Sequence, residues 1–259
     1  RRKLGSAAAA TAAFFGVALY SGVYGLAIAR AGAGRPLTGA GAGRVAAMWG
    51  AARAAGSRSS ASGCVAGDVF CGLGGWTWAL RLAGYSPRWG LDNHRSRLLL
   101  HAANHPGCAT VLGDVQKHQQ AAQQVSELGL APLWATSPPC QGYVTMNPAD
   151  PRRRLTVDSV KMFLAAEPRP SVLVLENVRR IFKPRPQPEL KHAMELLEAA
   201  GYTCHCGLLV ASWLGLPYMR ERFFLIAVAR GSGIECNLRQ RLAAARASAA
   251  RTAKPTLAE

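Results

Sequence analysis

One cysteine stands where a strand is expected to end, and its neighbours are those of a presented thiol. Cys140 lies between a Pro-Pro pair and a Gln-Gly pair, directly after the apolar run Ala131–Ala135. Prolines stop a strand and a glycine lets the backbone turn, so this thiol is expected at a tight turn rather than inside a core element. Because a thiolate is a strong nucleophile, the sequence predicts nucleophilic chemistry at Cys140.

A carboxylate is expected to lie beside this thiol. Glu176 follows the apolar run Val172–Leu175, which is typical of a buried parallel strand. The carboxyl ends of adjacent parallel strands open on one crevice, so Cys140 and Glu176 can converge although they lie far apart in the sequence. A carboxyl group can share a proton with a heterocyclic ring nitrogen, and the pair therefore suits covalent attack on an electron-poor ring. A salt bridge from Glu176 to Arg179 or Arg180 is the alternative.

Three earlier strand ends carry residues that could hold a cofactor. A glycine-rich turn, Gly72-Leu73-Gly74-Gly75, comes directly after the first expected strand and before a helix, where backbone amides can approach a ligand. Its spacing differs from the G-x-G-x-x-G pattern, and such turns occur in many folds. Asp92 and Asp114 follow the second and third expected strands. Either acid alone would more often cap a helix, but the series predicts a nucleotide-like pocket with an acid for the ribose hydroxyls.

The elements that must position these residues alternate along the chain. Short apolar runs and helical stretches take turns, which is typical of an α/β domain with a mostly parallel sheet and helices on both faces, a Rossmann-like fold. The expected strands are Cys64–Phe70, Pro87–Leu91, Ala109–Leu112, Pro132–Thr136, Ser171–Leu175, Cys204–Val210 and Arg222–Ala229. The expected helices are Trp76–Ala83, Arg95–Asn104, Gln116–Leu128, Thr156–Ala166 and Pro188–Ala200.

Charge and cysteine content restrict the partners and the compartment. The formal net charge is +17, and residues 1–67 contain no acid, whereas the middle of the chain mixes both signs with a positive excess. This suits a polyanion such as nucleic acid, although a solvated basic surface has the same composition.

The seven cysteines are odd in number and scattered, which indicates a reduced, intracellular compartment. Cys204-His205-Cys206 lacks the spacing and the second ligand pair of a zinc site, so no metal is expected.

The two ends of the chain differ from its middle. Residues 1–63 form a low-complexity basic extension, and residues 231–259 form a basic tail rich in Ala and Arg. Within the extension, the uncharged run 4–29 is long enough to span a bilayer but only weakly apolar. A membrane anchor, an organelle targeting segment and an uninformative extension all remain open, and the compartment stays unresolved between nucleus and organelle.

Four motifs, in this order, resemble the catalytic domain of cytosine-5 DNA methyltransferases. They are Phe70-Cys71-Gly72-Leu73-Gly74-Gly75, Pro138-Pro139-Cys140-Gln141-Gly142, Glu176-Asn177-Val178 and Gly215-Leu216-Pro217-Tyr218-Met219-Arg220-Glu221-Arg222. Their combination is far more specific than any one of them. The resemblance covers about residues 64–230, which are therefore expected to form the methyltransferase catalytic domain.

The resemblance implies S-adenosyl-L-methionine as the cofactor and DNA as the partner. One branch of the family acts on tRNA, which is the alternative substrate. By resemblance, the residues that line the cofactor pocket are Phe70, Gly72, Gly74 and Pro138. Asp92 would hold the ribose, and Asp114 would meet the adenine.

The resemblance also implies roles in catalysis. Cys140 would add to the ring carbon beside the methylated one, after the cytosine has been flipped out of the duplex. Glu176 would hydrogen-bond the ring nitrogen and the exocyclic amine as the adduct forms. Arg222 would support the base, with Arg220 nearby.

The sequence departs from the family pattern in several places. Asp92 stands where glutamate is usual, and Tyr218 stands where glutamine is usual. Tyr143 and Val144 follow Gln-Gly, where an aromatic residue and a serine are common. The target-recognition region and the final Asn-containing motif are not found, so the chain is expected to be a fragment that stops before them. A catalytically incomplete cofactor-binding or regulatory module is therefore the alternative function.

Overall fold

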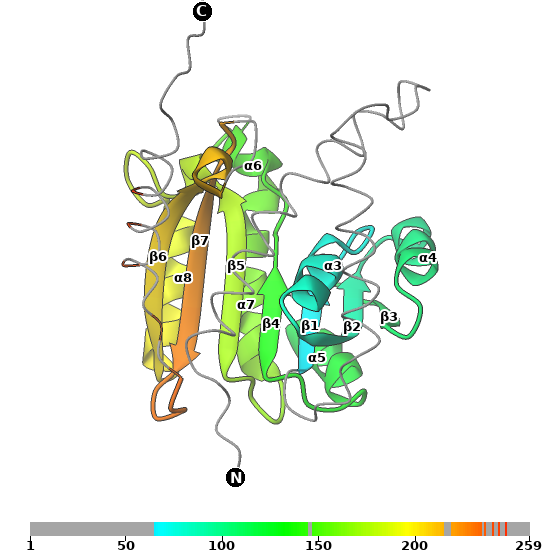
Figure 1. The fold of residues 1–259 in the computed structure, drawn as a ribbon. Coiled ribbons are helices and arrows are strands. Elements are labelled where there is room, and N and C mark those ends of the chain that lie inside the picture. Colours follow the sequence, from blue (N-terminus) through cyan, green and yellow to red (C-terminus); the bar gives the residue numbers. More distant parts are fainter. Residues whose placement is uncertain are drawn as a thin grey trace, which may run out of the picture.

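The described part of the chain is built on one seven-stranded sheet, in the order β3-β2-β1-β4-β5-β7-β6 (Figure 1). The structure is a computed structural model, and it describes residues 65–144, 147–214, 219–234 and 236, with positions 240, 243 and 247 of the tail. The extension 1–63, with its candidate membrane span 4–29, lies outside the described residues. Within the described ranges, no helix is both long enough and apolar enough to cross a bilayer.

The strands confirm the expected pattern of short apolar runs. Their bounds are β1 Val65–Val69, β2 Ser86–Asp92, β3 Ala109–Leu112, β4 Leu133–Thr136, β5 Val172–Val178, β6 Tyr202–Val210 and β7 Glu221–Ala229. The first five strands run parallel to one another, which confirms the mostly parallel sheet. Strand β7 lies between β5 and β6 and is antiparallel to both, so one edge of the sheet is antiparallel.

Strand β5 is longer than the sequence indicated. The expected strand Ser171–Leu175 ends before Glu176, whereas β5 continues to Val178. The reason is the partner strand, because β7 pairs with β5 as far as Val178 opposite Arg222. Glu176 therefore lies inside the strand, opposite Phe224, and its backbone is fixed by the ladder.

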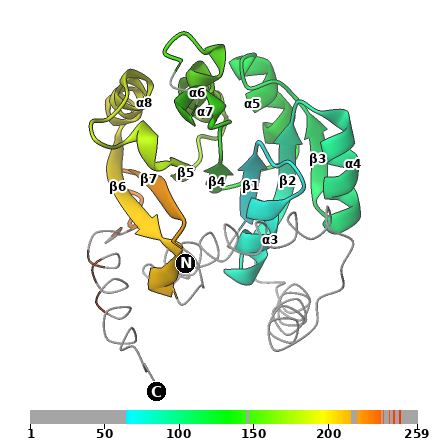
Figure 2. The same cartoon turned by 90° about the horizontal axis from the view of Figure 1, so that it is seen from above.

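Helices cover both faces of the sheet (Figure 2). Helices α5, α7 and α8 pack side by side on one face, and α3 lies on the other. Helix α4 joins α3 on that second face, because its His101 lies against Gly90 of β2 and against Thr77 of α3. The helices are α3 Gly75–Leu82, α4 Arg95–Asn104, α5 His118–Ser126, α6 Gln141–Val144, α7 Leu155–Ala165 and α8 Pro188–Ala199, with short 3-10 turns at Pro151–Arg154, Arg179–Ile181 and Ala211–Leu214.

Helix α5 is shorter than the expected Gln116–Leu128. The Gln116 N–H donates to the Asp114 carboxylate at 3.0 Å, so the chain first makes a turn and the helix begins at His118. A side chain that binds a backbone N–H two residues later favours a turn over a helix.

A row of aromatic rings packs the first face. Trp89 and Trp134 meet edge to face with centroids 4.8 Å apart, Trp134 meets Phe163 at 5.7 Å, and Phe163 meets Tyr202 at 5.3 Å. Each such pair contributes about 0.5–1.5 kcal/mol beyond the area it buries. The rings come from β2, β4, α7 and β6, so they fix the strands whose ends carry the candidate site.

Candidate active site

The thiol follows β4 on a loop that leads into a short helix. Strand β4 ends at Thr136, and the Cys140 carbonyl accepts hydrogen bonds from Tyr143 at 2.9 Å and Val144 at 3.1 Å. The expected tight turn is thus the beginning of α6, and Cys140 itself is partly exposed. Gly142 is required because a Cβ there would lie 2.6 Å from Arg153 Cγ.

Arg153 holds helix α6 in place. The Arg153 guanidinium donates to both Glu189 carboxylate oxygens, at 2.9 and 3.1 Å, and to Gln187 Oε1 at 2.8 Å. It also lies over the Tyr143 ring, 5.0 Å from the centroid, while the Tyr143 hydroxyl donates to the Arg153 carbonyl at 3.0 Å. This clamp, which no sequence pattern indicated, ties the segment after Cys140 to the start of α8.

Glu176 is paired with Arg222. Arg222 Nε lies 3.1 Å from Glu176 Oε1, and the two side chains are 19% and 16% exposed. The alternative partner Arg179 instead pairs with Glu221 at 3.2 Å, so the proposed salt bridge from Glu176 to Arg179 is not formed. Burial has the largest influence on Glu176 and raises the pKa of its carboxyl, while Ser137, Arg222 and Arg220 act in the opposite direction.

The predicted catalytic residues lie together at the carboxyl ends of β4 and β5. Arg152 and Arg222 both interact electrostatically with Cys140, although the bond to Asp150 is the main reason that the pKa of Arg152 is raised, and burial is the main reason that the pKa of Arg222 is lowered. Arg220 acts on Glu176 and on Arg222 from further away, and its own side chain is exposed. Residues 215–218 of the fourth motif lie outside the described ranges.

Asn177 connects the two strand ends. Its side chain is buried, and its Nδ2 donates to the Pro138 carbonyl at 3.2 Å. Asn177 belongs to the motif Glu176-Asn177-Val178, but no role was expected for it from the sequence. This bond holds the Pro-Pro segment before the thiol against β5.

The glycine-rich turn has unusual backbone conformations. Phe70 has a φ of 59°, which non-glycine residues rarely adopt, and Gly74 has a φ of 96°. A Cβ at Gly74 would lie 2.0 Å from the His105 ring, so glycine is required there. Asp92 fixes the turn from the next strand, because its buried carboxylate accepts from Gly72 N at 3.1 Å and from His94 N at 3.0 Å.

Asp114 lies beside a small cavity. This cavity has a volume of about 370 Å³, and its lining also includes residues that the sequence analysis missed, namely Asn93, Leu112, Gly113, Lys117, Gln120, Ala121 and Gln124. Asn93 could have been found from the sequence, because it directly follows Asp92. Asp114 therefore lines this pocket after the end of β3, and Asn93 lines it after the end of β2.

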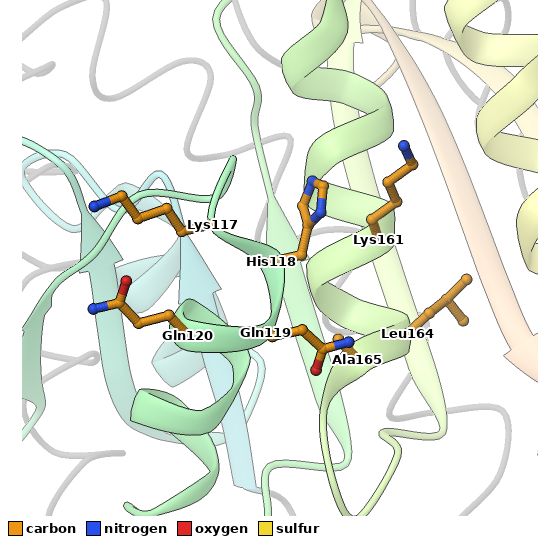
Figure 3. A pocket seen from close by; sticks show the side chains of 7 residues that line it. All are labelled: Lys117, His118, Gln119, Gln120, Lys161, Leu164 and Ala165. Atoms are coloured by element: carbon orange, nitrogen blue, oxygen red, sulfur yellow. The ribbon is translucent and has the colours of Figure 1, made fainter.

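A second hollow lies between α5 and α7 (Figure 3). It has a volume of about 660 Å³ and is lined by Lys117, His118, Gln119, Gln120, Lys161, Leu164 and Ala165. His118 Nε2 lies 3.0 Å from Asp158 Oδ1. None of the residues predicted for the site lines this hollow.

A buried carboxylate in β1 binds helix α3, which follows the glycine-rich turn. Asp68 Oδ2 accepts from the Thr77 N–H at 2.9 Å and from the Thr77 hydroxyl at 2.8 Å. Its Oδ1 is buried and has no hydrogen-bond partner among the described residues. Burial raises the pKa of Asp68 from 3.8 to about 7, although the bonds from Thr77 lower it.

This buried group makes stability depend on pH. Between about pH 4 and pH 7 the folded chain keeps a proton on Asp68 that the unfolded chain has lost, so stability falls as pH rises through this window. Asp68→Asn, which resembles the protonated form, should gain stability relative to the wild type over that window, by about 2–4 kcal/mol. Urea unfolding of both proteins from pH 4 to pH 8 measures the difference, and a constant difference would contradict the prediction.

Comparison with known proteins gives a consistent result. The family model for C-5 cytosine-specific DNA methylases matches residues 65–257. The chain is 28% identical over 179 residues to DNA (cytosine-5)-methyltransferase PliMCI of Paracentrotus lividus, covering 63% of this chain and 11% of that protein. It is 30% identical over 183 residues to type II methyltransferase M.HgiDI of Herpetosiphon aurantiacus, covering 68% of this chain and 56% of that protein.

Solved structures share the fold. A putative DNA modification methyltransferase from an E. coli prophage gives a TM-score of 0.58 at 22% identity, over 67% of this chain and 49% of that chain. The S. pombe Dnmt2 methyltransferase gives 0.57 at 20% identity, over 70% of this chain and 54% of that chain. The chain thus spans about half of these structures and a smaller share of PliMCI. Because the family model matches most of its length, the chain belongs to the C-5 cytosine-specific DNA methylase family.

Proposed function

We propose that this chain is the catalytic domain of a DNA (cytosine-5-)-methyltransferase, which transfers a methyl group from S-adenosyl-L-methionine to carbon 5 of a flipped-out cytosine. One observation carries the proposal. The thiol of Cys140 follows the carboxyl end of β4, and Glu176, near the carboxyl end of the adjacent strand β5, forms an ion pair with Arg222. A nucleophile and a partly buried acid on adjacent strand ends suit attack on a heterocyclic ring.

The glycine-rich turn fits the cofactor. A Cβ at Gly72 would meet only the Phe70 carbonyl, at 4.0 Å, so the space above this glycine is open to a ligand. The cofactor pocket would be lined by Phe70, Gly72, Gly74 and Pro138. S-adenosyl-L-methionine, when bound there, supplies an electrophilic methyl group. Two carboxylates lie at the carboxyl ends of the neighbouring strands β2 and β3. Asp92 would bind the ribose of the cofactor, and Asp114 would bind its adenine.

The proposed reaction begins with the Cys140 thiolate forming a bond to ring carbon 6. The ring electrons move toward carbon 5, and Glu176 donates a proton to ring nitrogen 3, so no full charge builds up on the ring. S-adenosyl-L-methionine, when bound, would supply the methyl group to carbon 5 and would leave as S-adenosylhomocysteine. Loss of the carbon 5 proton to solvent, elimination of the Cys140 thiolate from carbon 6 and return of the nitrogen 3 proton to Glu176 restore the aromatic ring. The raised pKa of Glu176 favours the protonated form that this step needs.

A basic groove beside this site supports a polyanionic substrate. It has a volume of about 720 Å³ and is lined by Val144, Val178, Arg179, Arg180, Lys183, Pro184, Glu221 and Arg222. Arg222 belongs both to this groove and to the pair with Glu176, so the groove opens directly on the candidate site. Exposed arginine and lysine side chains neutralise phosphates and position a nucleic acid backbone.

Removing two cations of this groove should weaken nucleic acid binding. Arg180→Ala/Lys183→Ala is expected to raise the Kd for duplex DNA, because up to two phosphate contacts are lost. The slope of log K against log salt should become shallower by about 1–2. Fluorescence anisotropy at several salt concentrations measures both effects. Arg88→Ala is the control, because Arg88 binds the Leu128 carbonyl at 3.1 Å, near the beginning of β4 and away from Cys140. Equal slopes in the double variant and the wild type would contradict the assignment.

A methyl-transfer assay tests the function itself. The chain is incubated with labelled cofactor and either duplex DNA or tRNA, and the products are digested to nucleosides for mass spectrometry. We expect 5-methylcytosine in the DNA. Label in tRNA alone would favour the RNA branch of the family. Calorimetric binding of the cofactor with no product in either nucleic acid would favour a cofactor-binding or regulatory module.

A further inference from the structure

Ser137 lies beside Glu176 at the ends of two paired strands. The last paired residues of β4 and β5 are Thr136 and Leu175, so Ser137 and Glu176 are the next pair along the same register. Two positions earlier, Ala135 and Val174 face each other, and both belong to the apolar cluster that α3 covers. Alternate residues of a strand share a face, so Ser137 and Glu176 are directed to the α3 side of the sheet.

A tryptophan of α3 holds the Ser137 hydroxyl. The Trp76 indole Nε1 donates to Ser137 Oγ at 2.6 Å, and Trp76 is only 2% exposed. An indole N–H can only donate, so the hydroxyl accepts in this bond and its single proton is left for another acceptor. That acceptor is the Glu176 carboxylate, because the bond from Ser137 lowers the pKa of Glu176.

We propose that Ser137 is a positioning residue whose hydroxyl, oriented by Trp76, holds the Glu176 carboxyl in the direction that catalysis requires. This inference rests on the proposed function, and it adds two residues to the predicted site. Ser137 and Arg222 bind Glu176 together, and Arg222 Nε lies 3.1 Å from Glu176 Oε1, so the position of the carboxyl is fixed by two partners. Trp76 follows the glycine-rich turn directly, and it therefore connects the cofactor side of the site to the acid.

The titration of Glu176 tests the proposal without substrate. The full chain is labelled with ¹³C at glutamate side-chain carboxyls, and the Glu176 signal is assigned from its absence in Glu176→Gln. In Ser137→Ala the pKa of Glu176 should rise above the wild-type value, because a hydrogen bond that favours the charged form is lost. Ser137→Thr keeps the hydroxyl and should restore it. Trp76→Phe frees the hydroxyl to rotate, so it should shift the titration in the same direction as the alanine variant.

A matched control and a kinetic measurement complete the test. The carboxyl signal of Glu189, which Arg153 binds, is the control and should be the same in all variants. In methyl transfer, Ser137→Ala should lower kcat about 10-fold with an unchanged cofactor KM, and Ser137→Thr should recover most of it. Ser137→Gly serves as the second hydroxyl-free variant if the alanine variant does not fold. An unchanged Glu176 titration without the hydroxyl overturns the proposal, whereas an inactive wild type overturns only the proposed function.

Discussion

Cys140→Ser is expected to lose methyl transfer by about 10⁴-fold or more, because a serine hydroxyl is almost entirely protonated at neutral pH and is a weak nucleophile. The substitution changes one atom on a partly exposed side chain, so the fold and the binding of the cofactor should persist. Initial rates with labelled cofactor and duplex DNA measure the loss. Calorimetry with the cofactor shows whether the pocket is intact.

The covalent adduct gives the more direct measurement for Cys140. A duplex that carries ring-fluorinated cytosine should trap the wild-type chain in a complex that survives denaturing electrophoresis. Fluorine replaces the carbon 5 hydrogen and cannot leave as a proton does, so the Cys140 thiol is not eliminated. Cys140→Ser should form no such complex. Cys204→Ser is the matched control, because burial raises the pKa of Cys204 to about 12 and its thiol in β6 stays protonated. A trapped complex with Cys140→Ser would contradict the role of this residue.

The parallel part of the sheet could be predicted because buried parallel strands leave a local pattern in the sequence. Such a strand is a short apolar run that ends in or before a turn-forming or acidic residue, such as Asp92 at the end of β2 or the Pro-Pro pair after β4. The end of β5 could not be predicted in this way. Its length is set by pairing with β7 through Val178 opposite Arg222, and no residue near Leu175 encodes a partner so distant in the sequence.

The candidate site could likewise be predicted only in part. Cys140 and Glu176 could be paired from sequence because both follow apolar runs, and parallel strands bring such ends together. The side chains that support them could not. The bond from Trp76 to Ser137 and the clamp of Arg153 on Glu189 join elements that only tertiary packing brings into contact. Asn177 could have been chosen as a candidate because it directly follows Glu176. Its bond to the Pro138 carbonyl, however, could not be predicted from the sequence.

Glu176→Gln is expected to lower kcat by about 10²–10³-fold, because an amide can hydrogen-bond the ring but cannot transfer a proton to nitrogen 3 as the Cys140 adduct forms. Glutamine keeps the length of the side chain, so binding of DNA and cofactor should change little. Glu195→Gln, on an exposed position of α8, is the control. Unfolding is measured in parallel, because the substitution also removes the partner of Arg222.

The pH profile assigns the loss to proton transfer rather than to a lost contact. Burial raises the pKa of Glu176, so its protonated form persists to higher pH than that of a solvent-exposed glutamate. In the wild type, kcat should therefore fall as pH rises through this pKa, since the carboxylate that forms has no proton to donate. Glutamine does not titrate, and the falling limb should be absent from the residual activity of Glu176→Gln. If the variant kept both the wild-type rate and the same falling limb, another group would be the acid, and Glu176 would serve only to bind Arg222.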